Sequence, residues 1–280
     1  MNNRFLVIAA FLCVFAGELY AATVDTVDTY SPSMKKNIKA VVVKPDSYDG
    51  KQDFPAVYLL HGYSGNYLSW IAEAGDILKD LSDRHQTIIV CPDGDFNSWY
   101  FDSPVDPTKK YETYVAKELV SWIDKHYSTI KSREGRGITG LSMGGHGAFY
   151  LAFKHQDVFG VAGSMSGGVD LRPFPNNWDM AAKLGTYAEN REVWDSHSVV
   201  NLTHLLTPGS LSLIFDCGTG DFFYQVNVKL HEKLLERNIP HDFTSRPGGH
   251  TWDYWRNSVK YHLLYMADFF QKTKGQNRRS

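Results

Sequence analysis

The segment at residues 140–147, Gly-Leu-Ser-Met-Gly-Gly-His-Gly, constrains the fold of this chain more than any other. The four residues before it are typical of a short buried strand, and residues 148–153 after it are typical of a helix. Its first five residues spell G-x-S-x-G, a pattern that places a serine on a tight, strained strand-to-helix turn. A Cβ atom at Gly140 or Gly144 would clash with neighbouring backbone. Ser142 is therefore predicted to stand at the tip of the turn.

The helix that follows this turn gives Ser142 a chemical role as well as a position. The first N–H groups of a helix have no partner within the helix, and the helix dipole adds partial positive charge there. An oxyanion that forms on an attacked carbonyl would be stabilised by these groups. Ser142 is accordingly predicted to be a nucleophile; the alternative is a glycine-rich turn with an incidental serine. An acid and a histidine in the right order would decide between the two.

The composition fits one α/β domain. The chain has 280 residues, of which 43% are hydrophobic, enough to bury a sizeable core. The formal net charge is −2 and no long basic run occurs, which argues against a nucleic-acid partner. We assign residues 23–280 to a single domain, because no repeat and no linker divides them.

The first 22 residues are typical of a signal peptide. A short positive segment at residues 2–4 precedes an apolar run over residues 5–17, and Ala21 and Ala22 offer cleavage sites. The run is shorter than the about 20 apolar residues that a membrane-spanning helix needs. The sequence therefore predicts a secreted or periplasmic protein with no membrane segment in its mature form. A buried first helix is the alternative.

Apolar runs of strand length alternate with segments of helical spacing along the rest of the chain. The expected strands are residues 38–43, 56–60, 87–91, 137–141, 159–166, 211–216 and 242–245. The expected helices are residues 67–81, 111–127, 148–153, 222–237 and 252–270. This alternation predicts an α/β fold with a mostly parallel central sheet and helices on both faces. Active groups of such sheets gather at the carboxyl ends of the strands. Polar residues follow the strands here at His61, Asp93, Ser142, Asp221 and His250.

Asp221 is the candidate acid that would orient a catalytic histidine. It lies just beyond the strand at residues 211–216, where a carboxylate can reach a neighbouring loop. Asp216 is the alternative acid, although it falls inside or at the edge of that strand. Aspartate also serves well as a helix N-cap, so the alternative role for Asp221 is to cap the following helix. The same side chain could both cap the helix and orient the histidine.

His250 is the candidate base, because among the 11 histidines it alone follows a candidate acid on a terminal strand-to-helix loop. Two glycines precede it and suit an approach to Ser142. An imidazole takes and returns a proton near working pH, and a carboxylate holds its useful tautomer. His146 is too close to the turn to reach Ser142, and His262 is expected to be structural.

Two backbone N–H groups are needed to hold an oxyanion. One belongs to Met143, the residue after the nucleophile. The other is expected from the loop after residues 56–60, where Gly62 permits a turn and Tyr63 is the donor that we choose. His61 is expected to form a structural hydrogen bond behind this hole.

Six motifs in collinear order give the sequence a resemblance to a known family. They are Leu59-Leu60-His61-Gly62, Pro92-Asp93-Gly94, Asn97-Ser98-Trp99-Tyr100, Gly140-Leu141-Ser142-Met143-Gly144-Gly145, Cys217-Gly218-Thr219-Gly220-Asp221-Phe222 and Gly249-His250-Thr251-Trp252. They cover about residues 38–270, and with them the chain resembles the esterase D group of α/β-hydrolases. That group includes S-formylglutathione hydrolases, feruloyl and acetylxylan esterases, tributyrin-type esterases and mycolyltransferases.

The resemblance implies a serine carboxylic ester hydrolase of the α/β-hydrolase fold that uses no cofactor or metal. It implies the roles already named: nucleophile Ser142, acid Asp221, base His250, oxyanion donors Tyr63 and Met143. The sequence departs from the family pattern at Gly220, where an acidic residue is common. That departure leaves Asp221 itself in place.

The predicted signal peptide argues against the glutathione-linked members of the group, which are cytosolic. We expect hydrolysis of short-acyl or feruloyl esters, on plant cell-wall polysaccharide or on a small molecule. Trp99, Tyr100 and Trp178 are the candidate substrate-binding residues, because aromatic rings offer flat faces to a sugar or a feruloyl ring. The alternatives are that these rings belong to the core, that the enzyme is a general small-ester esterase or an acyltransferase, and that the chain is a binding protein without activity.

Overall fold

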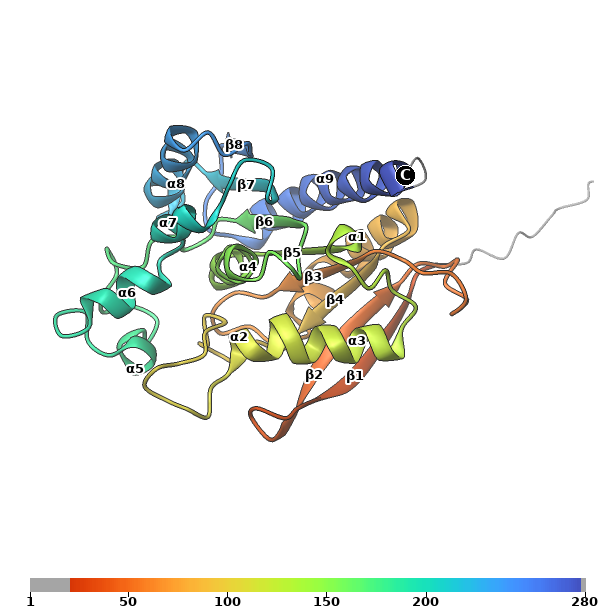
Figure 1. Ribbon diagram of the computed structural model, residues 1–280, viewed down its shortest axis with the longest axis horizontal. Coiled ribbons are helices and arrows are strands. Elements are labelled where there is room, and N and C mark those ends of the chain that lie inside the picture. The colour runs from red at the N-terminus through yellow and green to blue at the C-terminus, as the bar shows by residue number, and fades with distance from the viewer. Residues whose placement is uncertain (1–20, 278–280) are drawn as a thin grey trace, which may run out of the picture.

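A computed structural model describes residues 21–277 of the chain, with side chains as far as residue 275. Most of the predicted signal peptide, residues 1–20, lies outside this part. From residue 23 onward the chain forms one sheet with helices packed against it (Figure 1).

Eight strands form the sheet, in the order β1-β2-β4-β3-β5-β6-β7-β8. Strands β3 to β8 are parallel to one another, whereas β2 is antiparallel to β1 and to β4. Their bounds are β1 Thr23–Ser31, β2 Lys36–Lys44, β3 Ala56–Leu60, β4 Ile88–Pro92, β5 Arg136–Gly140, β6 Val161–Met165, β7 Ser212–Gly218 and β8 Asp242–Arg246. The predicted α/β fold with a mostly parallel central sheet is confirmed.

Strand β1 lies at one edge of the sheet, and the sequence pattern does not predict it. Of its side chains only those of Thr29 and Ser31 are fully buried, so it lacks the apolar alternation of a half-buried strand. It pairs with β2 over its whole length, and the Thr29 hydroxyl lies 2.6 Å from that of Tyr114. Backbone pairing, more than apolar burial, holds this strand in place.

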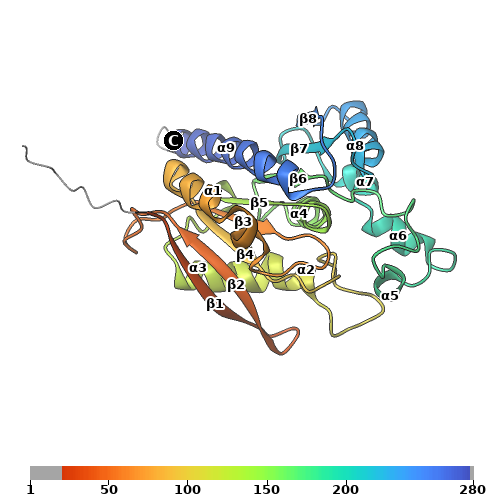
Figure 2. The same cartoon turned by 180° about the vertical axis from the view of Figure 1, so that it is seen from behind.

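Helices cover both faces of the sheet, as predicted (Figures 1 and 2). Helices α1 and α9 pack together on one face, and α3, α4 and α8 lie on the other. The bounds are α1 Ser69–His85, α2 Tyr111–Thr113, η1 Tyr114–Leu119, α3 Val120–His126, η2 Arg133–Gly135, α4 Met143–Lys154, α5 Ala181–Leu184, α6 Arg191–His197, α7 Val199–Leu202, η3 Thr203–Leu205, α8 Tyr224–Glu236 and α9 Trp252–Asn277. Among residues 21–277, no helix has the length and apolar character needed to cross a membrane.

Helix α4 lies in the middle of the molecule. All its side chains from Met143 to Phe153 are buried, and so are all residues of β3, β5 and β6. Large aromatic side chains of α4, such as Phe149 and Phe153, fill the space between the helix and the sheet. This burial places the first turn of α4 against the carboxyl ends of the central strands.

His146 sits inside α4 with no exposed surface, and its Nε2 atom lies 2.8 Å from the carbonyl oxygen of His197. The rings of Trp99, Phe101 and Tyr150 surround it. Burial disfavours the imidazolium ion and lowers the pKa of His146 to about 3. Because histidine in an unfolded chain has a pKa of about 6.5, the unfolded state binds more protons between these two values.

We therefore expect the free energy of unfolding to fall as the pH drops from about 6.5 toward about 3. His146 alone contributes a slope of up to about 1.4 kcal/mol per pH unit, since only the unfolded state takes up its proton there. His146→Gln keeps an N–H donor for the His197 carbonyl but does not titrate. Denaturant unfolding at several pH values should give a shallower pH slope for the variant, and an unchanged slope would refute this assignment.

Candidate active site

Ser142 joins the end of β5 to the start of α4 in a left-handed backbone conformation, with φ 55° and ψ −116°. Such a conformation is strained for any residue other than glycine. Backbone hydrogen bonds hold it: the Ser142 N–H donates to the Met165 carbonyl at 2.9 Å, and the Ser142 carbonyl accepts from the N–H groups of His146 at 3.0 Å and Gly168 at 3.4 Å. The predicted strained turn is confirmed.

The glycines around Ser142 allow a very close approach of two backbones. A Cβ atom at Gly140 would lie 2.7 Å from the carbonyl carbon and oxygen of Gly144, and one at Gly144 would lie 2.5 Å from the Leu60 oxygen. Contacts this short with backbone atoms cannot be relieved by turning a side chain. Glycine is thus required at both positions, as the motif predicts.

His250 lies between Ser142 and Asp221. Its Nε2 atom is 2.8 Å from the Ser142 hydroxyl oxygen, and its Nδ1 atom is 2.8 Å from Asp221 Oδ2. Because a carboxylate only accepts hydrogen bonds, Nδ1 carries the proton and Nε2 accepts from the serine hydroxyl. The structure thus brings the three predicted residues together in the arrangement that lets histidine remove the serine proton.

Asp221 is held by the backbone around it. Its side chain has no exposed surface, and its second oxygen, Oδ1, accepts the Phe223 N–H at 2.8 Å. The carboxylate therefore caps the following turn and orients His250 at the same time. The loops that carry the acid and the base are also joined directly, because the Gly220 N–H donates to the Gly248 carbonyl at 2.9 Å.

Asp216, the alternative acid, belongs to a different network. It lies inside β7, pairs with Arg246 of β8, and has Oδ2 3.9 Å from Nε2 of His262. Burial raises the pKa of Asp216 to about 6, against the opposing charge of Arg246. His262 in turn lies 2.8 Å from the Thr139 hydroxyl, which gives it the structural role expected. Within the described residues, Asp216 makes no hydrogen bond to His250.

The two predicted oxyanion donors have free N–H groups. Met143 is the first residue of α4, so its N–H has no acceptor within the helix. The Tyr63 N–H has no hydrogen-bond acceptor within residues 21–277. His61 fixes the Tyr63 loop, since its Nε2 accepts the Gly94 N–H at 2.7 Å and its Nδ1–H donates to the Gly62 carbonyl at 2.8 Å. The expected structural hydrogen bonds of His61 are thus confirmed.

A cleft of about 340 Å³ opens over Ser142 and His250. Five aromatic residues line it: Tyr63, Trp178, Phe222, Trp252 and Trp255. The Phe222 ring lies 4.3 Å from that of His250 and 5.9 Å from that of Trp178, between ring centroids. Trp178 is therefore at the cleft, as predicted. No pattern in the sequence marks Phe222, Trp252 and Trp255 as cleft residues, although each follows a predicted catalytic residue closely in the chain.

Trp99 and Tyr100 do not line the cleft, which corrects the prediction that they contact substrate. Both side chains are 0% exposed. The Tyr100 hydroxyl donates to the His61 carbonyl at 3.1 Å, and the Trp99 ring packs against that of Trp178 at 5.7 Å. These two rings are core residues that support the oxyanion loop and the wall of the cleft.

Asp179 connects the wall of the cleft to the oxyanion loop. Its Oδ2 atom accepts hydrogen bonds from the Tyr63 hydroxyl at 3.3 Å and from Asn97 Nδ2 at 3.2 Å. Asp179 and its neighbour Trp178 both have left-handed backbone conformations, with φ 55° and 52°. The bonds of Asp179 therefore help to keep Trp178 at the cleft. Nothing in the sequence marks Asp179, because its partners are 116 and 82 residues away.

Metal-ligating side chains do not gather into a site in the part of the chain that the structure describes: no group of three or more is arranged to hold an ion. The polar side chains that line the cleft include Ser142 and His250, with Ser64 and Ser69 beside the oxyanion loop, and Asp221 lies behind His250.

The chain was compared with known protein families, and the model of the Esterase family matches residues 31–266. The chain belongs to this family. It is 28% identical over 263 residues to an acetyl esterase of Caldicellulosiruptor saccharolyticus, covering 86% of this chain and 97% of that protein. It is 24% identical over 256 residues to the S-formylglutathione hydrolase of Mus musculus, covering 82% of this chain and 88% of that protein.

A solved structure of a ferulic acid esterase matches this esterase with a TM-score of 0.76 and 28% identity, covering 90% of this chain and 99% of that one. The predicted esterase D-type family and α/β-hydrolase fold are confirmed by these matches. The esterase is a serine carboxylic ester hydrolase.

Two conservative substitutions in this esterase test which aspartate is the catalytic acid. Asp221→Asn should lower kcat by about 10⁴-fold, because an amide no longer holds the His250 tautomer or stabilises its cation. Asp216→Asn should cost far less activity, because Asp216 touches neither His250 nor the cleft. Turnover of p-nitrophenyl acetate measures both effects.

Circular dichroism of both variants provides the control, since each must retain the fold. A larger loss of kcat in a folded Asp216→Asn protein than in Asp221→Asn would show that Asp221 is not the acid.

Proposed function

We propose that this esterase is a secreted serine carboxylesterase that removes short-acyl or feruloyl groups through an acyl-enzyme on Ser142. One observation carries the mechanism: hydrogen bonds of 2.8 Å run from Ser142 through His250 to the buried Asp221, at the base of an open cleft. A serine hydroxyl becomes an effective nucleophile when an adjacent base can take its proton and a third group orients that base.

Each step uses a group that lies in place. His250 Nε2 takes the hydroxyl proton as Ser142 Oγ attacks the ester carbonyl, and Asp221 stabilises the resulting imidazolium. The oxyanion of the tetrahedral intermediate accepts hydrogen bonds from the N–H groups of Tyr63 and Met143. His250 then gives its proton to the departing alcohol, and a water molecule repeats the sequence to release the acid.

The aromatic wall of the cleft supports a feruloyl or other flat acyl group. The rings of Trp178 and Phe222 are stacked, with 25° between their planes, and an aromatic acyl group could extend this stack. Similarity to an acetyl esterase and to a ferulic acid esterase structure supports the two acyl classes proposed. The proposed export would place the esterase outside the cytoplasm, where plant cell-wall polysaccharide is the ester-bearing alcohol that we propose.

The position of Ala22 supports export with cleavage after Ala21. Ala22 is 5% exposed, and its N–H donates to Asp83 Oδ2 at 3.0 Å. Cleavage after Ala21 would place the new amino group beside this carboxylate, where the opposite charge favours it. Cleavage after Ala22 would instead remove a buried residue.

A substrate panel tests the proposed specificity on the chain that begins at Ala22. We expect higher kcat/KM for methyl ferulate and acetylated xylan than for tributyrin and S-formylglutathione. Trp178→Ala should lower kcat/KM for methyl ferulate by about tenfold, the equivalent of an aromatic contact of about 1.4 kcal/mol, and leave p-nitrophenyl acetate nearly unchanged.

Trp122→Ala is the matched control, because Trp122 stacks on His126 of α3 and does not line the cleft. A preference for S-formylglutathione or tributyrin would overturn the polysaccharide assignment. Formation of a new ester in the presence of a competing alcohol, in place of the free acid, would show acyl transfer.

A further inference from the structure

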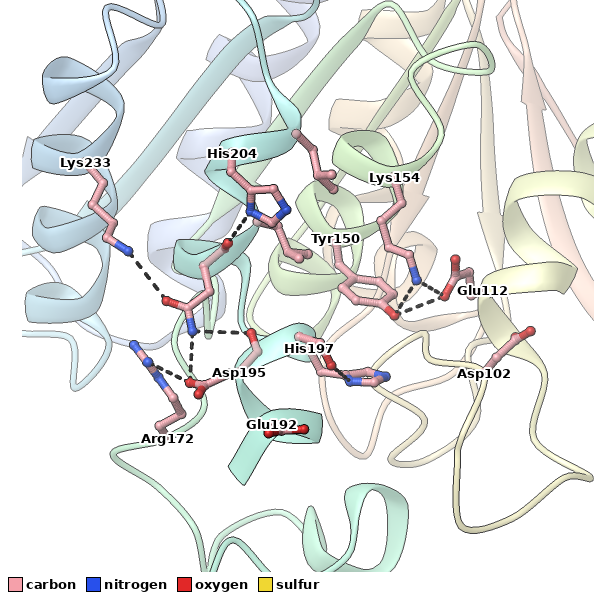
Figure 3. Close-up of a pocket in the computed structure, with 14 residues that line it drawn as sticks. Asp102, Glu112, Tyr150, Lys154, Arg172, Glu192, Asp195, His197, His204 and Lys233 are labelled. Atoms are coloured by element: carbon pink, nitrogen blue, oxygen red, sulfur yellow. Dashed lines mark hydrogen bonds and ion pairs between the residues drawn. The ribbon is translucent and has the colours of Figure 1, made fainter. Parts of the chain in front are cut away.

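A hollow larger than the catalytic cleft lies beside helix α4 (Figure 3). Its volume is about 990 Å³, against about 340 Å³ for the cleft, and among the described residues the two share no lining residue. We call it the α4 groove and define it by Glu112, Tyr150, Lys154, Asp195, His197 and Leu205. The segment 168–205 lines both hollows, with Trp178 at the cleft and His197 in the groove.

Charged side chains of both signs line the α4 groove, and four of them form two ion pairs (Figure 3). Glu112 accepts hydrogen bonds from the Tyr150 hydroxyl at 3.0 Å and from Lys154 Nζ at 2.7 Å. Asp195 accepts one from Arg172 at 2.8 Å. Asp102, Glu192 and Lys233 also line the groove and form no ion pair within the described residues. Because the wall carries acidic and basic groups side by side, neither an anion nor a cation finds a surface of one opposite sign, and a neutral ligand fits it better.

His197 presents a hydrogen-bond acceptor to the groove. Its Nδ1 atom lies 2.7 Å from the Val193 carbonyl oxygen and must donate to it, so Nε2 carries no proton. Burial lowers the pKa of His197, which keeps the ring neutral. Its ring stacks on that of Tyr150 at 5.6 Å with 17° between the planes. Within the described residues Nε2 has no protein partner, so it is free to accept from a ligand.

An apolar strip lies next to these polar groups. Leu202 and Leu205 line the groove, and Leu205 is 39% exposed. A ligand that fits this surface offers hydroxyl groups, which both donate and accept, together with apolar C–H faces. Sugars combine the two properties and carry no charge.

We propose that the α4 groove is a second binding site, for a neutral oligosaccharide segment of a glycan. The choice of a plant cell-wall glycan rests on the proposed function. Tyr150 follows Ser142 by eight residues on α4, a distance of about 12 Å at 1.5 Å per residue. A chain held in the groove therefore raises the local concentration of its ester groups near the catalytic serine.

Titration with xylohexaose, followed by amide chemical shifts in NMR spectra of the mature chain, tests the groove. Saturable shifts are expected at Tyr150, His197 and Leu205. His197→Phe keeps the stacked ring but lacks the Nε2 acceptor, and the Val193 carbonyl retains the Ser196 hydroxyl as donor at 2.9 Å. This variant should bind xylohexaose about three- to tenfold more weakly, because it loses one hydrogen bond to the ligand.

Leu205→Asp should also weaken binding, because it places a charge in the apolar strip. Leu264→Asp is the matched control: Leu264 is 49% exposed and lies on α9, outside the groove. The two groove variants should raise KM for acetylated xylan and leave kcat/KM for p-nitrophenyl acetate unchanged.

Shifts confined to the catalytic cleft, an absence of saturable binding, or groove variants no weaker than Leu264→Asp would overturn the proposal. Binding of xylohexaose in the groove by an enzyme that does not cleave acetylated xylan would support the groove and refute the polysaccharide part of the proposed function.

Discussion

The rest of the structure depends on the close approach of the first turn of α4 to the ends of β3 and β5. Backbone touches backbone there, with no room for a side chain at Gly140 or Gly144. The approach forces Ser142 into a left-handed conformation and leaves the Met143 N–H without an acceptor in the helix. The position of the nucleophile and the free N–H of one oxyanion donor thus both result from the close packing of α4 against β3 and β5.

Burial of α4 is what maintains that constraint. A strained residue persists only where the surrounding structure over-determines it, and α4 is buried from Met143 to Phe153. The acid and the base are then brought to the nucleophile from two neighbouring strands, β7 and β8. The hydrogen bond from Gly220 to Gly248 joins their loops, so the distance between Asp221 and His250 does not depend on the carboxylate–imidazole contact alone.

The sequence predicts the parts of this protein that local patterns determine. The apolar runs and the glycine-flanked serine place most of the strands and helices and the turn at Ser142, because each follows from residues near one another in the chain. The candidate acid and base are predicted differently, from their order after Ser142 and their place beyond predicted strands, since His250 lies 108 residues from Ser142. Strand β1 is not predictable in this way, since pairing with β2 holds it without an apolar face. Trp99 and Tyr100 show a second limit: an aromatic loop near a site can belong to its core support. Asp179 shows a third, because only the folded chain brings its partners to it.

The claim that Ser142 is the activated nucleophile can be tested directly by covalent labelling. A fluorophosphonate reacts with a serine whose hydroxyl has an adjacent base, and peptide mass spectrometry locates the adduct. We expect one phosphonyl group per chain, on the peptide that contains Ser142, with loss of esterase activity in proportion to labelling. Adduct formation at another residue, or loss of activity while the Ser142 peptide remains unmodified, would contradict the central role of Ser142.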